Sequence, residues 1–118
     1  MKTSPMQRSL KMLRRDGWQV AILERWNQYA KVRQDCWGFG DLLACRPSKD
    51  PLDVGTIALI QTTTAANMAA RREKILSIPQ SRQWKLAGGM IILHGWKKGP
   101  KNGVRGAVKV WSCREENL

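Results

Sequence analysis

Residues 55–64 have the sequence GTIALIQTTT, an apolar run that ends in polar side chains. Its middle, residues 57–60, is apolar at every position, which predicts a central strand that is buried on both faces. Residues two apart in a strand share a face, so we expect Gln61 and Thr63 to point the same way at the end of this strand. A central strand that ends in polar side chains can hold them rigidly above a cleft.

A second, shorter apolar run lies upstream at residues 40–45, with the sequence GDLLAC, and Asp41 stands at its head. If the two runs pair as neighbouring strands, the carboxylate of Asp41 and the amide oxygen of Gln61 converge. Oxygen ligands of this kind suit Mg²⁺, which normally keeps several of its water ligands. The sequence therefore predicts a candidate metal site where these two strands meet.

The rest of the chain predicts a single mixed α/β domain, residues 1–118, with a central sheet of about five strands. A Ser4–Gln7 capping box and Pro5 begin a helix that Asp16 and Gly17 end. Pro79 is expected to end a second helix. The predicted elements are a helix at 4–16, strands at 18–26, 41–45 and 56–63, a helix at 65–78, and strands at 90–96 and 107–113. Residues 27–34 are expected to form a polar loop, 46–55 and 97–106 turns, and 115–118 a frayed tail.

The chain is strongly basic, with 21 Lys and Arg against 9 Asp and Glu and a formal net charge of +12. Such an excess on a small domain favours a polyanionic partner, because Lys and Arg displace the counterions that condense on nucleic-acid phosphates. The alternative is a charge that serves solubility or ribosome association. The basic balance thus makes nucleic acid the first partner to consider.

Cysteine and histidine usage excludes several kinds of site. The three cysteines form no CxxC pair, and one histidine, His94, must serve every scheme that needs one, so neither a structural zinc site nor a Ser/His/Asp or Cys/His set is expected. We expect His94 to be structural or to contact DNA. The N-terminus lacks the apolar core of a signal peptide, and no apolar run is long enough for a membrane span. These features predict an intracellular, cytoplasmic protein without disulfides.

The predicted order of elements, with GFGDLLA carrying the acid and IALIQTT the central strand, resembles the PD-(D/E)XK nucleases. Within that superfamily the chain is similar to archaeal-type Holliday junction resolvases and VRR-NUC-like nucleases, over residues 4–78 and more loosely beyond. The resemblance implies a restriction-endonuclease-like αβββαβ core and Mg²⁺- or Mn²⁺-dependent hydrolysis of DNA phosphodiesters in recombination or repair. It also implies a homodimer, because cutting a symmetric junction requires two active sites. A small nuclease of this kind would suit a phage or another mobile element.

Two residues depart from the pattern of that superfamily. Gln61 stands where the family often has Glu, and its amide can offer a metal an oxygen without a charge. Thr63 stands where the family usually has a Lys that orients water and stabilises transition-state charge. Lys74 is the expected substitute, because Asn67, Arg71 and Lys74 share one face of the following helix. Alternatively, Lys74 is a solvated surface residue.

The resemblance places Asp41 and Gln61 as metal ligands and Thr63 or Lys74 as residues that assist the reaction, and the backbone carbonyl of Thr62 could complete the ligand set. Further acids and amides lie close to this site in the sequence. Asp35 could bind the metal or pair with Arg33. Gln7 and Glu24 could complete the site, although capping explains Gln7 and an ion pair with Arg25 or Arg33 explains Glu24.

Basic and aromatic residues supply a predicted DNA-binding surface. Trp26 and Trp37 could stack on unpaired bases of branched or single-stranded DNA, whereas Trp18 and Trp111 are expected in the core. The residues expected to contact phosphates are Arg33, Arg71, Lys97, Lys98, Lys101 and Arg105.

Two alternatives remain open at this point. The chain could be a catalytically weak or inactive nuclease-fold protein that binds DNA, since the central motif has lost both its Glu and its Lys. It could also be a small basic α/β domain that binds RNA or DNA by charge alone. This last alternative predicts no clustering of Asp41, Gln61 and Lys74.

Overall fold

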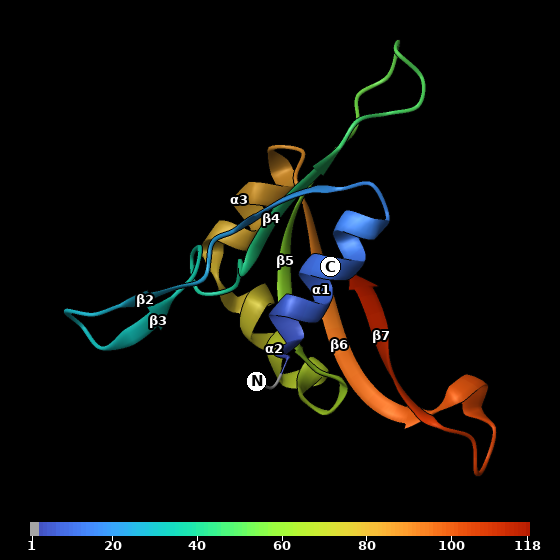
Figure 1. Cartoon of the computed structure of the whole chain (residues 1–118). Coiled ribbons are helices and arrows are strands. Elements are labelled where there is room, and N and C mark those ends of the chain that lie inside the picture. Colours follow the sequence, from blue (N-terminus) through green and yellow to red (C-terminus); the bar gives the residue numbers. More distant parts are fainter. Residues whose placement is uncertain (1–2) are drawn as a thin grey trace.

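Strand β5 (Thr56–Thr64) lies at the centre of a five-stranded sheet in the computed structural model, which describes residues 3–118. The strand order is β1-β4-β5-β6-β7 (Figure 1). The other strands of this sheet are β1 (Gln19–Ile22), β4 (Leu42–Arg46), β6 (Met90–Pro100) and β7 (Lys109–Asn117). The helices are α1 (Pro5–Arg15), α2 (Met68–Ser77) and α3 (Pro79–Leu86). The predicted mixed α/β fold with a central five-stranded sheet is therefore confirmed.

The sheet mixes antiparallel and parallel pairs. Strands β1 and β4, β4 and β5, and β6 and β7 pair antiparallel, whereas β5 and β6 pair parallel. A parallel pair needs a long crossover, and here the 3₁₀ turn η1 (Ala65–Asn67) together with α2 and α3 provides it. The two strands predicted to carry Asp41 and Gln61 are thus direct neighbours, with Leu42 opposite Ile60.

Helix α1 covers one face of the sheet, and α2 and α3 cover the other (Figure 1). The alternation along β5 creates both cores, because Ile60 packs with Leu13 of α1 whereas Leu59 packs with Ile75 of α2. The predicted start of α1 is confirmed: Ser4 caps the helix in a reciprocal capping box with Gln7.

The prediction of one strand over residues 18–26 is wrong. Strand β1 ends at Ile22, and the chain then bends away from the main sheet. It enters a separate two-stranded hairpin made of β2 (Arg25–Asn27) and β3 (Val32–Gln34), so the predicted loop at 27–34 is partly strand. This hairpin projects from the body of the protein (Figure 1).

The predicted end of the second helix before Pro79 is confirmed, since α2 ends at Ser77, but helix α3 was not predicted. Pro79 occupies the first turn of α3, where its fixed φ and missing N–H suit a helix start. The C-terminal residues are not frayed, because Asn117 pairs with Ile92 and the Leu118 N–H donates to the Ile91 carbonyl over 2.9 Å. Strand β7 therefore runs almost to the end of the chain.

The two tryptophans predicted for the core differ in their surroundings. Trp18 is partly buried and packs against the core on the α1 face. Trp111 remains 45% exposed on β7, where the Arg8 guanidinium lies 3.8 Å from its ring centroid, so its predicted core position is wrong. Over residues 3–118, none of the helices is long and apolar enough to cross a membrane.

Candidate functional site

Asp41 lies directly before β4, and its backbone is held from two sides. Its N–H donates to the Ile60 carbonyl over 2.9 Å, and its carbonyl accepts from the N–H groups of Leu23 and Glu24. These bonds fix the side chain beside the end of β5, where Gln61 and Thr62 follow Ile60. The position depends on the bend after β1, since Leu23 and Glu24 have left the strand when they contact Asp41.

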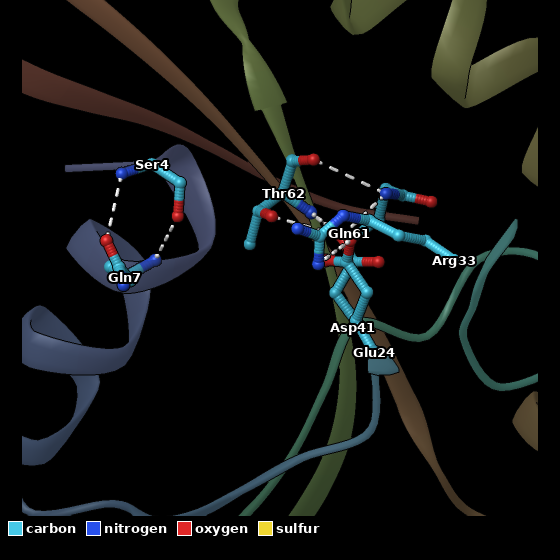
Figure 2. A network of polar contacts seen from close by, with 7 residues as sticks. All are labelled: Ser4, Gln7, Glu24, Arg33, Asp41, Gln61 and Thr62. Atoms are coloured by element: carbon cyan, nitrogen blue, oxygen red, sulfur yellow. Dashed lines mark hydrogen bonds and ion pairs between the residues drawn. The ribbon is translucent and has the colours of Figure 1, made fainter. Parts of the chain in front are cut away.

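Asp41 is 5% exposed, and its carboxylate accepts three hydrogen bonds on one oxygen (Figure 2). Its Oδ2 accepts from the Thr62 N–H at 2.9 Å, from the Thr62 hydroxyl at 3.0 Å and from Gln61 Nε2 at 2.8 Å. Among residues 3–118, no side chain or backbone group donates to Oδ1 of the same carboxylate. One oxygen is therefore fully engaged and the other is free to accept a ligand.

Gln61 is equally buried, at 3% exposure, and its amide is only half satisfied. Its Nε2 donates to Asp41 and, at 3.3 Å, to the Thr62 carbonyl, whereas its Oε1 is buried and has no partner in the described part of the chain. A buried acceptor without a donor costs about 1–3 kcal/mol, so such atoms are rare in folded proteins. An unsatisfied oxygen beside a free carboxylate oxygen points to a ligand.

Burial is the main reason why the pKa of Asp41 is raised, from 3.8 to about 6. The two hydrogen bonds from Thr62 lower the pKa, and the negative charges of Glu24 and Asp35 raise it. A carboxyl group whose pKa lies this close to neutrality is typical of functional sites, because proteins seldom bury an unpaired acid for stability alone.

These groups line one cavity with a volume of about 530 Å³. The structure brings together on its wall all six residues predicted as metal ligands or as additional members of the site: Gln7, Glu24, Asp35, Asp41, Gln61 and Thr62. The cavity therefore joins α1, the β1–β2 bend, the end of β3 and the central strand.

Two arginines add positive charge to the same wall. Arg33 comes from β3, and its Nη1 lies 3.8 Å from Glu24 Oε1, so the predicted ion pair of Glu24 is present. Arg71 comes from the first turn of α2 and is half-buried. Asp35 forms no ion pair with Arg33 or with any other cation in the described chain.

Other predicted site residues lie elsewhere. Thr63 is buried, as its place on the Gln61 face of β5 requires, but it is absent from the cavity wall. Lys74 is exposed and also absent from that wall, which agrees with the solvated alternative rather than with the migrated lysine. The hairpin residues predicted to contact phosphates, Lys97, Lys98, Lys101 and Arg105, are exposed and lie outside the cavity.

The sequence predicted no Ser/His/acid set, and this prediction is wrong, because the structure brings Ser9, His94 and Glu115 together. Ser9 Oγ lies 2.9 Å from His94 Nδ1, and Glu115 Oε2 lies 3.0 Å from His94 Nε2. Ser9 and His94 are fully buried, however, and the Ser9 hydroxyl also accepts a hydrogen bond from Trp96 Nε1 at 2.8 Å. Burial lowers the pKa of His94, although Glu115 opposes this shift. Because the Ser9 hydroxyl is fully buried and already bonded to His94 and Trp96, the set is structural.

Sequence reasoning missed the contribution of the start of α1. The N-cap Ser4 and the first helical residues, Pro5 and Met6, line the cavity because the capping box places the helix start against it. Gln34, on β3, was missed as well, because the β2–β3 hairpin was not predicted. The capping box was the available signal for the first group.

Across residues 3–118, no three His, Cys, Asp or Glu side chains form a group that could hold a metal ion. The predicted ligand set is of another kind, with the carboxylates of Asp41 and Asp35, the amide of Gln61 and the backbone carbonyl of Thr62, and it stays a prediction. No protein-family model, no curated protein and no solved structure matches the chain.

Proposed function

We propose that the protein is a metal-dependent DNA endonuclease of the PD-(D/E)XK type, with its active site in the cavity at Asp41. The observation that carries the proposal is the buried pair of Asp41 and Gln61, which keeps one carboxylate oxygen and one amide oxygen without donors. The buried amide oxygen without a donor costs the fold stability by itself. Both oxygens would be used if a hard cation binds there.

The donor set suits Mg²⁺ or Mn²⁺, since Mg²⁺ sites in proteins commonly use one or two carboxylates, with water and substrate phosphate oxygens as the remaining ligands. Asp41 Oδ1 and Gln61 Oε1 would supply the side-chain ligands, the Thr62 carbonyl could add a third, and Asp35 and Glu24 would act from the cavity wall. When bound, such an ion lowers the pKa of a coordinated water and neutralises charge on a phosphate.

Arg33 and Arg71 replace, in this proposal, the lysine that the resemblance leads one to expect. Both arginines line the cavity, whereas no lysine does so within the described residues. A guanidinium binds phosphate in a bidentate manner, and it holds transition-state charge without losing its own proton. The acids on the same wall would repel a phosphate unless these two cations and the metal offset them.

The proposed substrate is DNA, for which the net charge of +12 provides long-range attraction. Cleavage of a symmetric four-way junction would require two copies of the site and thus a homodimer. Such a substrate places the protein inside the cell, in the recombination or repair of host, phage or mobile-element DNA.

A specific observation favours a second candidate, a nuclease-fold protein that binds DNA without cutting it. Lys74 and Thr63 both stand away from the cavity, so no residue there matches the lysine of the catalytic motif. In this alternative the buried pair would bind a cation that only bridges the protein to a phosphate.

The experiment incubates the purified protein with labelled four-way junction, flap, single-stranded and duplex DNA in Mg²⁺, Mn²⁺ or EDTA. The proposal predicts cleavage that requires metal and that is lost in Asp41→Ala. The cleavage rates on the four DNAs would then rank them as substrates. Binding without cleavage in either metal would reject the nuclease and support the DNA-binding alternative.

A further inference from the structure

A second hollow, with a volume of about 730 Å³, adjoins the Asp41 cavity. The two share Arg33, Gln34 and Asp35 on their walls, so they meet along the end of β3. Arg25 of β2 and Trp37 line only the second hollow. A DNA strand with one phosphate in the Asp41 cavity would therefore have a neighbouring nucleotide within reach of the second hollow.

Trp37 is an unusual residue in both backbone and exposure. Its φ of 58° lies in the left-handed region, which is sparsely populated by bulky residues and carries an energetic cost. The turn is closed by backbone bonds between Cys36 and Gly40, at 2.8 and 2.9 Å. Despite this support Trp37 stays 48% exposed. The turn thus holds an aromatic ring at the surface of the hollow at a cost to the backbone.

Two other aromatic rings restrict the ring of Trp37. Its centroid lies 6.3 Å from that of Phe39, which is fully buried, and 6.2 Å from that of Trp84 on α3. These contacts restrict the ring while Trp37 stays half exposed, so stacking a base on this platform would cost little side-chain entropy.

The charge around this platform favours a nucleic-acid strand. The hairpin segment 25–34 carries Arg25, Lys31 and Arg33 and has no acidic residue, although Asp35 and Glu24 stand at its base. The hairpin projects away from the sheet (Figure 1) and exposes Trp26 and Tyr29. Cations interleaved with exposed aromatic rings are typical of surfaces that bind single strands.

We propose that the second hollow is a base-stacking subsite for an unpaired nucleotide of the DNA strand whose phosphate enters the Asp41 cavity. Trp37 is the stacking platform, and Arg25, Lys31 and Arg33 hold the adjoining backbone. The identity of the ligand as DNA rests on the proposed function, whereas binding at this subsite requires neither metal nor cleavage.

The test measures the affinity of the full-length protein for a labelled oligothymidine of about 12 nucleotides and for a duplex of the same length, by fluorescence anisotropy in EDTA. Trp37→Ala is expected to weaken single-strand binding about tenfold, since one base–aromatic stack is removed, and to leave duplex binding almost unchanged. Trp37→Phe should retain most of the affinity. Trp111→Ala is the matched control, because Trp111 is similarly exposed but lines neither hollow.

Single-strand affinity that is unchanged in Trp37→Ala, or reduced equally for both DNAs, would overturn the subsite, as would a wild type that binds no single strand. If Trp37→Ala does not fold, Trp37→Leu, which keeps apolar contact with Phe39 and Trp84, replaces it with the same expectation. If single-stranded DNA binding depends on Trp37 but the protein cuts no DNA in Mg²⁺, the subsite is retained and the nuclease is rejected. If the protein cuts DNA but binds single strands equally well without Trp37, the nuclease is retained and the subsite is rejected.

Discussion

Burying the carboxylate of Asp41 makes the free energy of unfolding depend on pH. Its pKa is about 6 in the folded protein and 3.8 in an unperturbed chain, so between these values the folded state binds more protons than the unfolded state. The contribution of Asp41 to stability is therefore fully present below pH 3.8 and is lost as the pH rises through 6. A shift of this size corresponds to about 3 kcal/mol.

We therefore predict that Asp41→Asn is more stable than the wild type at about pH 8 without metal, by up to about 3 kcal/mol, and that the difference shrinks toward about pH 3. Urea denaturation of both proteins across this range measures it. Asp50→Asn, on the exposed turn before β5, is the control for replacing a carboxylate by an amide at the surface. A variant that is less stable than the wild type at every pH would refute the argument from burial.

Gln61 offers a complementary test, because its Nε2 lies 2.8 Å from Asp41 Oδ2. Gln61→Glu would place two carboxylates at this distance, which raises their pKa values and destabilises the metal-free protein near neutral pH. We expect a lower melting temperature in EDTA and a larger increase on adding Mg²⁺ than the wild type shows.

Gln34→Glu is the matched control for that substitution, since Gln34 lines the same cavity but is exposed. It adds the same charge without burying it, so its melting temperature should change little in EDTA. If Mg²⁺ shifts Gln61→Glu no more than Gln34→Glu, the buried pair is not a metal site.

At the scale of single residues, the sequence was informative within strands, where side chains alternate with a period of two. The expected convergence of Asp41 and Gln61 depended on pairing between runs 40–45 and 55–64, and that pairing is present and brings the two side chains together. The sequence did not place Lys74, because α2 begins only at Met68 and each residue advances about 1.5 Å along a helix axis. Arg71 in the first turn reaches the cavity wall, whereas Lys74 shares its face but lies farther along the axis.

At the scale of elements, the β2–β3 hairpin was not predicted, because it does not bury an apolar face. The β2–β3 hairpin exposes most of its residues and is held partly by Asn27, whose side chain accepts from the N–H groups of Tyr29 and Ala30 and donates to Gln34. No periodic pattern marks such a hairpin. Helix α3 was missed for another reason, since proline both stops one helix and suits the start of the next.

A polar set joins α1 to β6 and β7: Ser9, His94 and Trp96 are buried, and the exposed Glu115 bonds to His94 from β7. Ser9→Ala removes the partner of both the Trp96 N–H and the His94 ring. We predict a decrease of about 1–3 kcal/mol in the free energy of unfolding, measured in urea, because buried polar groups are left unsatisfied.

The same substitution should leave cleavage at low temperature unchanged, since Ser9 does not line the cavity. Ser112→Ala serves as its control, because the Ser112 hydroxyl makes only an exposed 3.4 Å contact with the Lys97 carbonyl. That variant should stay within about 0.5 kcal/mol of the wild type. Loss of cleavage in folded Ser9→Ala would instead assign the polar set a part in the reaction.

At the scale of the whole molecule, a flat body carries projecting hairpins and a net charge of +12. The β6–β7 hairpin holds Lys97, Lys98 and Lys101 away from the Asp41 cavity, so these residues would act only through phosphate charge. Replacing all three by Ala should reduce the slope of log affinity against log salt by about 0.9 for each phosphate that the variant no longer neutralises.

This salt dependence separates the two predicted DNA-binding regions when anisotropy is measured over a range of NaCl concentrations. The triple variant should weaken duplex and single-strand binding alike, whereas Trp37→Ala should leave the slope unchanged, because a stacked ring releases no counterions. If the slope of log affinity against log salt is unaltered in the triple variant, the β6–β7 hairpin is not part of the DNA-binding surface.

The measurement that tests the central claim most directly is the rate of four-way junction cleavage in Mg²⁺ by the wild type and by Asp41→Asn. We predict a rate that falls by more than about a hundredfold in the variant, since even removing a partner of a metal ligand costs about 10- to 100-fold. Because the variant is expected to be the more stable protein, unfolding would not explain the decrease. Equal rates in the two proteins, or no cleavage by a wild type that binds the junction, would contradict the assignment of the Asp41 cavity as a nuclease active site.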